Sequence, residues 1–274
     1  MITFQDVFFS YPIGKQERLP ALRGLSGEIR KGEFLAVLGP NGSGKSTFAK
    51  LLNALLVPES GEVHVFGWDT RDSSHLWDIR QAVGMVFQNP ENQLVASTIE
   101  EDVAFGPENL GLPPKEIQAR VEEALRKTGL SGQRRTDIHA LSGGEKQLVA
   151  IAGVLAMLPS FIIFDEATTM LDSENRAIVL DAVRKLREDH GIGVVLITHR
   201  MEEAVLADRI LVIGNGEILL QGSPLEVFSL GAKVRSLGLD LPPMLQLAEL
   251  LRKEGVSLSG TPLTVSEMEG ALQL

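Results

Sequence analysis

A glycine-rich segment at residues 39–46 constrains the fold of this chain more than any other feature of the sequence. Its eight residues, Gly-Pro-Asn-Gly-Ser-Gly-Lys-Ser, match the pattern G-x-x-x-x-G-K-[ST] at every fixed position. The apolar run at residues 34–38 is typical of a buried strand, and residues 47–56 place apolar side chains at helical spacing. A strand, a glycine loop and a helix in this order favour a phosphate-binding loop (P-loop) over a flexible turn.

The P-loop predicts a nucleotide site with defined roles for its residues. Backbone N–H groups of a glycine loop converge on phosphate oxygens, and the positive end of the following helix dipole favours the same anions. We expect the Lys45 ammonium to reach the terminal phosphates, where it also assists phosphoryl transfer, and the Ser46 hydroxyl to hold Mg²⁺. The residues expected to contact the nucleotide are Gly39, Asn41, Gly42, Ser43, Gly44, Lys45, Ser46 and Thr47.

Composition and charge exclude several other classes of protein. The 274 residues, 44% of them hydrophobic, suffice for one large core with a small appendage. The net charge of −10 argues against nucleic acid as a partner, and the absence of cysteine excludes disulfides and thiolate metal sites. No signal segment opens the chain, and the longest apolar stretch, residues 148–158, spans only eleven residues. We therefore expect a cytoplasmic protein whose membrane role comes through a partner.

Strand and helix signals alternate along the chain, which predicts an α/β fold. Helices are expected from Pro113-Pro114 onward, at residues 148–158 and at residues 173–186. Asn215-Gly216 is a strong hairpin signal and adds an antiparallel edge to the predicted sheet. A polar loop containing Pro12, Gly14 and Pro20 is expected between the first two strands. Strands are expected at residues 2–9, 21–29, 34–38, 62–66, 83–87, 161–164, 194–197, 209–213 and 217–221.

The pattern weakens beyond Ser223. Residues 242–243 are two prolines, and they precede Met244, Leu247, Ala248 and Leu251 at helical spacing. Residues 264–272 are compatible with one more short helix. We expect a nucleotide-binding domain at residues 1–222, with a helical subdomain at about 89–158, and a small C-terminal appendage at 223–274 rather than a disordered tail.

Two strand ends and one loop supply further reactive groups. Asp165 ends an apolar strand and is expected to bind Mg²⁺, which leaves Glu166 to polarise the water that attacks the terminal phosphate. His199 ends another strand and could donate a hydrogen bond to the transferring phosphoryl group, although a lone histidine at a strand end is often a surface residue. Gln88 follows the strand at 83–87 and could reach the metal or the attacking water; the alternative is a solvated loop residue.

A second glycine motif lies at residues 141–147, Leu-Ser-Gly-Gly-Glu-Lys-Gln, directly before the buried helix. Ser142, Gly143 and Gly144 are expected to form a second anion-binding helix N-terminus. This segment resembles the signature sequence of ATP-binding cassette (ABC) ATPases, and it lies between the P-loop and the acidic pair, as it does in that family. The resemblance covers residues 1–222 and implies a P-loop NTPase fold of ABC type with a mixed sheet, an antiparallel edge sheet and a helical subdomain.

The ABC resemblance also implies cofactors and a partner. It implies that ATP and Mg²⁺ bind between two chains, with the P-loop of one facing the signature of the other. Residues 169–172 resemble the D-loop that crosses this interface. The resemblance favours adenine stacking for Tyr11, the only tyrosine in the chain, with core packing or a surface position as the competing interpretations.

A narrower resemblance follows Gln88. Residues 87–95 and 100–109 resemble the ATP-binding subunits of energy-coupling factor (ECF) transporters, which include cobalt and nickel importers. This implies a homo- or heterodimer of ATPases on the cytoplasmic face of the membrane, a transmembrane coupling subunit that docks near residues 89–109, and a separate substrate-binding membrane subunit. An acidic, solvated helical subdomain is the alternative for this segment. For the whole chain the alternatives are another transporter class, a non-hydrolysing cassette, or a soluble ABC ATPase outside transport.

Three residues depart from the usual ABC pattern. Glu145 stands where glutamine is common, and Leu148 where a basic residue is frequent. Both lie outside the Ser-Gly-Gly segment, so we expect ATPase competence to survive. Met170 replaces a small residue of the D-loop, which puts communication across the dimer interface in doubt.

Overall fold

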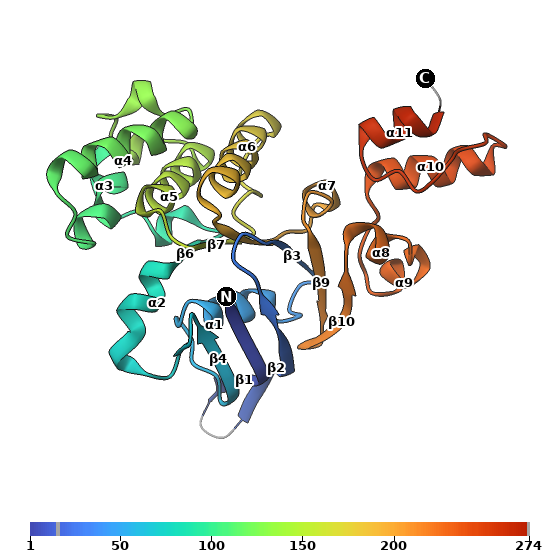
Figure 1. The fold of residues 1–274 in the computed structure, drawn as a ribbon, viewed down its shortest axis with the longest axis horizontal. Coiled ribbons are helices and arrows are strands. Elements are labelled where there is room, and N and C mark those ends of the chain that lie inside the picture. The colour runs from blue at the N-terminus through green and yellow to red at the C-terminus, as the bar shows by residue number, and fades with distance from the viewer. Residues whose placement is uncertain (15–16, 273–274) are drawn as a thin grey trace.

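The central feature of the computed structural model is a six-stranded sheet with the order β10-β9-β3-β8-β7-β6 (Figure 1). The structure describes residues 1–14 and 17–272. All neighbouring strands of this sheet are parallel except β10, which pairs antiparallel with β9 through the predicted Asn215-Gly216 turn. The strands are β3 (Phe34–Leu38), β6 (Val83–Val86), β7 (Phe161–Asp165), β8 (Gly193–Ile197), β9 (Arg209–Gly214) and β10 (Glu217–Gly222).

A second, antiparallel sheet has the order β2-β1-β4-β5. Its strands are β1 (Ile2–Ile13), β2 (Glu17–Ile29), β4 (Ser60–Val65) and β5 (Trp68–Asp69). Helix α1 (Lys45–Leu52) lies between the two sheets, where Phe48, Leu51 and Leu52 are fully buried in a core that both sheets share. The P-loop therefore emerges from the centre of the molecule, with a sheet on each side of its helix.

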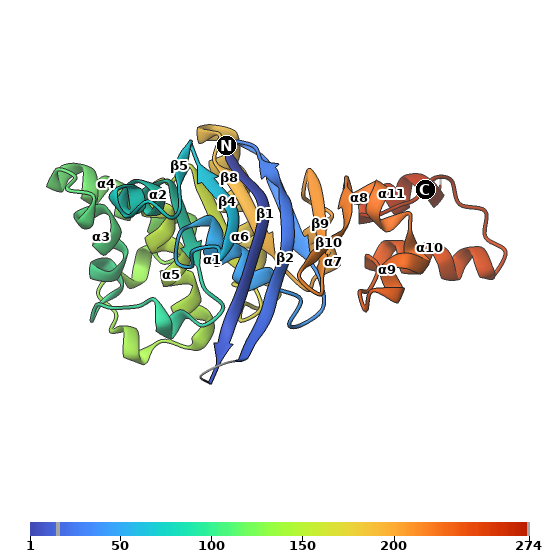
Figure 2. The same cartoon turned by 90° about the horizontal axis from the view of Figure 1, so that it is seen from below.

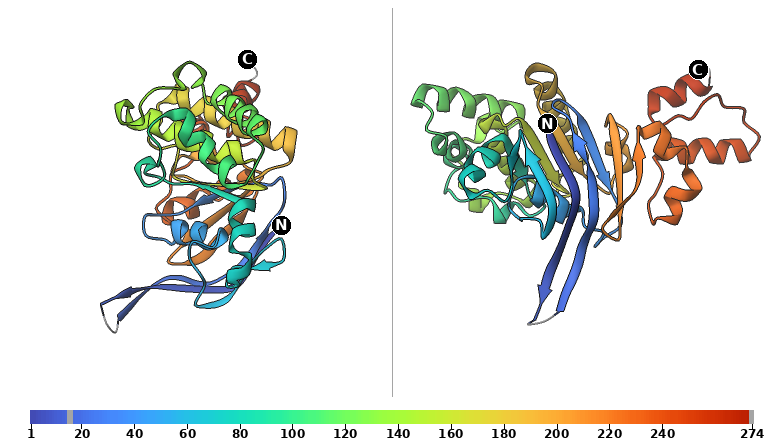
Figure 3. Two further views of the ribbon diagram at one scale, coloured as in Figure 1. Left: turned by 90° about the vertical axis from the view of Figure 1, so that its left-hand side faces the viewer. Right: turned by 60° about the horizontal axis from the view of Figure 1, so that its bottom comes forward.

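The predicted loop around Pro12 and Pro20 is wrong over most of its length. Strands β1 and β2 continue as a two-stranded ribbon, in which Tyr11 is paired with Leu19 and Pro20 with Ser10 (Figure 3). Strand β4 pairs with β1 only as far as Phe8, so the ribbon has open edges that tolerate proline, which has no N–H to donate. Residues 15–16 of the predicted loop lie outside the described residues.

Three long helices cover the face of the parallel sheet that is away from α1. They are α4 (Pro114–Lys127), α5 (Gly143–Met157) and α6 (Ser173–His190), with α3 (Ile99–Asn109) packed on α4 and α5. The helix predicted after Pro113-Pro114 is confirmed as α4, which buries Val121, Ala124 and Leu125. Short elements complete this part of the chain: α2 (Leu76–Ala82), α7 (Met201–Ala204) and the 3₁₀ turns Ser73–His75, Pro90–Asn92, Ser131–Gln133 and Ile138–Ala140.

Four helices follow β10: α8 (Pro224–Phe228), α9 (Gly231–Ser236), α10 (Pro243–Lys253) and α11 (Val265–Leu272). They lie at the opposite end of the molecule from α3 and α4 (Figure 2). The predicted helices are present, but the predicted inner face of α10 is partly wrong, because Leu245 and Ala248 are buried whereas Leu247 is exposed. Residues 273–274 of the predicted appendage lie outside the described part of the chain. Within the described residues, none of the helices has the length and apolar character needed to cross a bilayer.

Candidate nucleotide site

The P-loop connects the end of β3 to the start of α1 in a conformation that requires glycine at two positions. Gly39 has φ 153°, and a Cβ there would lie 2.1 Å from the Ile213 carbonyl oxygen. Gly44 is the N-cap of α1 with φ 105°, and a Cβ there would lie 2.5 Å from the Ala21 carbonyl oxygen. Backbone atoms cannot yield as a flexible side chain does, so these glycines allow the loop to pass between β9 and β2.

Lys45 lies at the centre of the loop and is only 5% exposed. Its Nζ donates hydrogen bonds to the carbonyl oxygens of Gly39 (2.9 Å) and Pro40 (3.1 Å) and lies 3.9 Å from Glu166 Oε1. Burial lowers the pKa of Lys45, and the negative charges of Glu166 and Asp165 partly oppose this shift. The ammonium group is thus held over the loop, at the point where a terminal phosphate would compensate its charge.

Ser46 and Asp165 bring two oxygen ligands together from opposite sides of the loop. Ser46 Oγ donates a hydrogen bond of 2.8 Å to Asp165 Oδ1. Burial raises the pKa of Asp165, although the bond from Ser46 acts in the other direction. One carboxylate and one hydroxyl fit Mg²⁺, which takes few protein ligands and completes its shell with water and phosphate oxygens. Among the described residues, no group of three or more His, Cys, Asp or Glu side chains is placed to hold a metal ion.

Glu166 is the point at which four loops meet. Its Oε1 lies 2.8 Å from His199 Nε2, and its Oε2 accepts a hydrogen bond of 3.0 Å from Gln88 Nε2. The backbone of Glu166 is left-handed, with φ 53°, and its N–H donates to the carbonyl oxygen of Ile197. The structure therefore brings Lys45, Gln88 and His199 to one carboxylate, although Gln88 and His199 are themselves exposed. Their chemical roles stay predictions.

Tyr11 forms a wall of the pocket in front of the P-loop. The pocket measures about 250 Å³, and Tyr11 lines it together with Leu19, Pro20, Ala21, residues 41–47 and Glu166. The Tyr11 hydroxyl shares a hydrogen bond of 3.1 Å with Thr47 Oγ1, and its ring packs edge-on against Phe9. The side chain is thus neither buried in the core nor free in solvent. Sequence reasoning missed Leu19 and Pro20, because it placed them in or beside a loop, whereas in the structure they lie in β2, opposite Tyr11 and Ser10 respectively.

The second glycine motif forms the start of α5 but does not line this pocket. Ser142 is the N-cap: its Oγ accepts from the Glu145 N–H (3.3 Å), and Glu145 Oε2 accepts from the Ser142 N–H (2.9 Å). This reciprocal pair is a capping box, and it explains why a glutamate is stable at position 145. Gly143 and Gly144 are only partly covered, so their N–H groups remain available to a ligand outside this chain.

One buried carboxylate beside the site was not predicted from the sequence. Glu203 in α7 is 1% exposed, and its Oε2 accepts hydrogen bonds from the hydroxyls of Thr168 and Thr198. Burial raises the pKa of Glu203, and the two hydroxyls oppose this shift. Nothing in the local sequence distinguishes Glu203 from its exposed neighbour Glu202.

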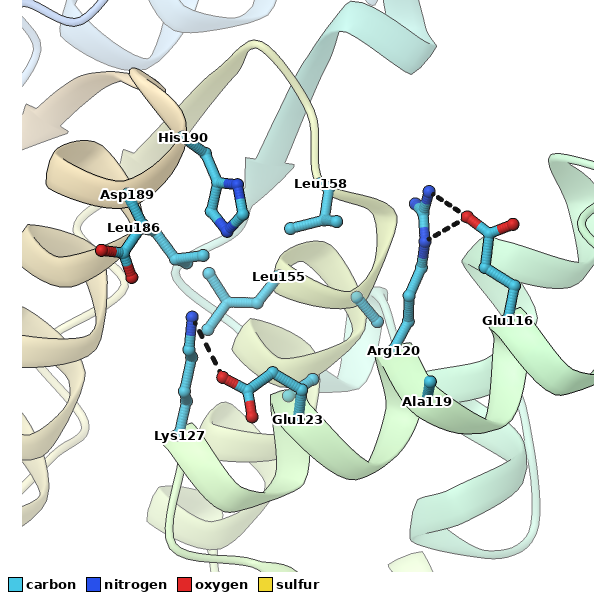
Figure 4. Close-up of a pocket in the computed structure, with 12 residues that line it drawn as sticks. Glu116, Ala119, Arg120, Glu123, Lys127, Leu155, Leu158, Leu186, Asp189 and His190 are labelled. Carbon is cyan, nitrogen blue, oxygen red and sulfur yellow. Dashed lines mark hydrogen bonds and ion pairs between the residues drawn. The ribbon is translucent and has the colours of Figure 1, made fainter.

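A second cavity, of about 380 Å³, lies between α4, α5 and α6 (Figure 4). Its floor is apolar and includes Leu155 and Leu186, and its rim is charged. Two of the rim cations are already paired, Arg120 with Glu116 (2.7 Å) and Lys127 with Glu123 (3.3 Å). This cavity contains none of the P-loop residues, so we assign the nucleotide to the pocket beside Tyr11.

Comparison with known proteins places the chain in a family. Residues 22–169 match the family described as ABC transporter. A dimeric cassette, MJ0796, in a post-hydrolysis state bound to ADP and Pi has a TM-score of 0.76 and 32% identity, over 82% of this chain and 99% of that one. The structure of cbiO1 from Clostridium perfringens, described as part of the ABC transporter complex cbiONQ, has a TM-score of 0.75 and 34% identity, over 90% of this chain and 98% of that one. The chain is an ABC-type ATPase.

Two curated relatives narrow this class. The energy-coupling factor transporter ATP-binding protein EcfA1 of Clostridium novyi is 52% identical over 99% of this chain and 97% of its own length. The EcfA1 protein of Symbiobacterium thermophilum is 55% identical over 96% and 94%. The chain belongs to the family of ECF transporter ATP-binding proteins. This confirms the predicted ABC-type α/β fold and the predicted ATPase activity of a transporter subunit.

Proposed function

We propose that this chain powers the import of a vitamin or a transition-metal ion from the cytoplasmic face of the membrane. The observation that carries the proposal is the meeting of Lys45, Gln88 and His199 at the Glu166 carboxylate, next to the pair of Ser46 and Asp165. These groups come from four loops that are distant in sequence. A phosphate-binding lysine, two metal ligands and a candidate general base then lie within one site, as phosphoryl transfer to water requires.

Each residue has a role in the proposed reaction. Lys45 and the P-loop N–H groups bind the terminal phosphates, while Ser46 and Asp165 would hold Mg²⁺, which when bound supplies charge neutralisation at the phosphate oxygens. Glu166 accepts a proton from the attacking water. His199 and Gln88 contact different oxygens of the Glu166 carboxylate and orient it. Gln88 is also proposed as a ligand of Mg²⁺, and His199 as a donor to the transferring phosphoryl group. Tyr11 provides the aromatic face for adenine.

Dimerisation links this site to transport. Ser142, Gly143 and Gly144 present a helix N-terminus at the surface of the chain, outside its own nucleotide pocket. We propose that they bind the terminal phosphate of ATP held by the partner ATPase. ATP would then stabilise the closed dimer by contacts with both chains, and hydrolysis would remove the shared phosphate and release the interface.

We further propose that residues 1–222 form the nucleotide-binding domain with 223–274 as a small C-terminal appendage. We also propose that the segment at residues 89–109 docks the transmembrane subunit. Two acidic residues of the segment have contacts within the chain: Glu100 pairs with Arg134 at 2.6 Å, and Glu101 completes a capping box with Thr98. Reversing their charges would therefore disturb the segment itself. Val95 and Phe105 are better probes, because they are apolar yet 64% and 50% exposed.

The experiment is to express Phe105→Gln with its own membrane subunits and to measure co-purification and ATP-driven uptake in vesicles. Val57→Gln, an exposed apolar residue outside the segment, is the matched control. We expect Phe105→Gln to lower co-purification and uptake while the isolated subunit binds ATP normally. Failure of the unaltered chain to recover any membrane subunit would contradict the transport function and favour a soluble ABC ATPase. Normal uptake by Phe105→Gln would contradict only the docking surface.

A further inference from the structure

A single buried carboxylate connects the loops that present Glu166 and His199. Glu203 Oε2 accepts a hydrogen bond of 2.6 Å from Thr198 Oγ1 and another of 3.0 Å from Thr168 Oγ1. Thr198 directly precedes His199, and Thr168 lies two residues after Glu166. One oxygen atom thus joins the two strand ends whose side chains meet 2.8 Å apart at the proposed hydrolytic site.

The other oxygen of Glu203 faces a cation. Glu203 Oε1 has no hydrogen-bond partner and lies 3.5 Å from Arg176 Nε, on helix α6. Arg176 Nη2 donates to the carbonyl oxygen of Leu171 at 2.5 Å, and its Nε is 3.5 Å from the carbonyl oxygen of Thr168. The hydrogen bonds of Arg176 therefore attach the turn at residues 168–171 to α6, and its ion pair with Glu203 connects this turn to α7. A buried carboxylate with one oxygen that accepts no hydrogen bond is costly to maintain, so stability alone does not explain its presence.

Thr198 is held on two sides. Its Oγ1 donates to Glu203 and also accepts the N–H of Arg200 at 3.0 Å, so the backbone on both sides of His199 is attached to one hydroxyl. Thr168, Thr198 and Glu203 are each 1% exposed. With no solvent to compete, these bonds hold the backbone on either side of His199, just beyond the end of β8.

We propose that Glu203 is a positioning residue for ATP hydrolysis: through Thr198 and Thr168 it sets the contact between His199 and Glu166, and through Arg176 it fixes the turn that follows Glu166. Glu203 is buried and is proposed to act only through these groups. The inference rests on the proposed catalytic roles of Glu166 and His199. It predicts that loss of Glu203 impairs turnover rather than ATP binding, because the P-loop contacts of ATP lie on other elements.

The test uses conservative substitutions in the ATPase assembled with its partners. Thr198→Val removes the hydroxyl at nearly constant shape, whereas Thr198→Ser keeps it. Glu203→Gln keeps an acceptor for both hydroxyls but removes the charge that pairs with Arg176, and Glu202→Gln, on the exposed neighbour, is the matched control. Thr168→Val is a further variant should Glu203→Gln fail to fold. The measurements are kcat, KM for ATP, affinity for a non-hydrolysable ATP analogue, and thermal melting.

We expect Thr198→Val and Glu203→Gln to lower kcat about 10-fold or more, since small misplacements of catalytic groups cost up to ~10²-fold, with KM and analogue affinity within about twofold. Thr198→Ser and Glu202→Gln should retain kcat within about twofold. In the Glu166→Gln background, Glu203→Gln should cause little further loss, because groups that act as one unit are not additive. Normal kcat in both variants, or parallel loss of kcat, affinity and melting temperature, would overturn the inference.

Glu166→Gln and His199→Ala, measured in parallel, separate this inference from the function on which it rests. If both lose turnover while the Glu203 and Thr198 variants retain it, only the positioning role is wrong. If Glu166→Gln and His199→Ala keep normal turnover, the proposed hydrolytic site is wrong and the positioning role falls with it.

Discussion

Replacing Lys45 by alanine tests how the P-loop recognises phosphate. In the structure the Lys45 ammonium is buried and is satisfied by two loop carbonyls and by the charge of Glu166 at 3.9 Å. Burial lowers the pKa of Lys45, which means that its charged form lacks full compensation within the chain. A terminal phosphate supplies that compensation, so the charged hydrogen bond to it should be a strong one.

A hydrogen bond to a charged group contributes about 1.5–3 kcal/mol, which corresponds to a factor of about 10–150 in affinity. We therefore expect Lys45→Ala to weaken binding of a non-hydrolysable ATP analogue by about one to two orders of magnitude. Isothermal titration calorimetry on the purified subunit measures this directly. Lys31→Ala, at an exposed lysine far from the loop, should bind normally. Unchanged affinity in Lys45→Ala would refute the reasoning.

Substitutions at two further positions test the proposed metal ligand Asp165 and the capping box of α5. Burial raises the pKa of Asp165 above its ordinary value of 3.8, so the folded chain loses stability as pH rises from that value through the raised pKa. Asp165→Asn should remove this loss, so its melting temperature without ligands should exceed that of the original chain at pH 7.5. Its Mg²⁺-dependent hydrolysis should be abolished. A lower melting temperature would contradict the conclusion that the buried Asp165 carboxylate destabilises the fold. Glu145→Ala removes one half of the capping box with Ser142 and should lower the unfolding free energy, measured by urea denaturation, by about 0.3–1.5 kcal/mol. Glu145→Gln should lower the unfolding free energy by less, because glutamine can also accept the Ser142 N–H. Equal losses in the two Glu145 variants would count against the capping box.

The sequence predicts best those elements whose chemical or structural signal lies in residues that are adjacent in the chain. The P-loop, the strand that ends in Asp165 and the Asn215-Gly216 hairpin are each defined by contiguous residues, and the structure has them at the predicted places. Asp165 and Ser46, by contrast, are 119 residues apart, and only the shared edge of the parallel sheet brings them within 2.8 Å. Their meeting was predictable because parallel strands end at one edge and P-loop sites use that edge.

The features that the sequence did not predict depend on partners elsewhere in the chain. The ribbon around Tyr11 and Leu19 exists because two proline-containing segments pair with each other, and local signals favour a loop there. The inner face of α10 is set by what packs on Leu245, not by the spacing of its apolar residues. Glu203 is buried against Arg176, Thr168 and Thr198, and no local pattern in the sequence encodes these contacts.

The most direct test of the account is the turnover of Glu166→Gln in the ATPase assembled with its partners. Glutamine keeps the size and hydrogen-bonding capacity of Glu166 but cannot accept the proton of the attacking water. We predict that ATP hydrolysis falls about 10²-fold or more, that ATP still binds, and that size-exclusion chromatography with ATP detects a stable closed dimer. Glu174→Gln, at an exposed glutamate on α6, should hydrolyse ATP normally. Near-normal hydrolysis by Glu166→Gln would contradict the central claim that Glu166 is the general base.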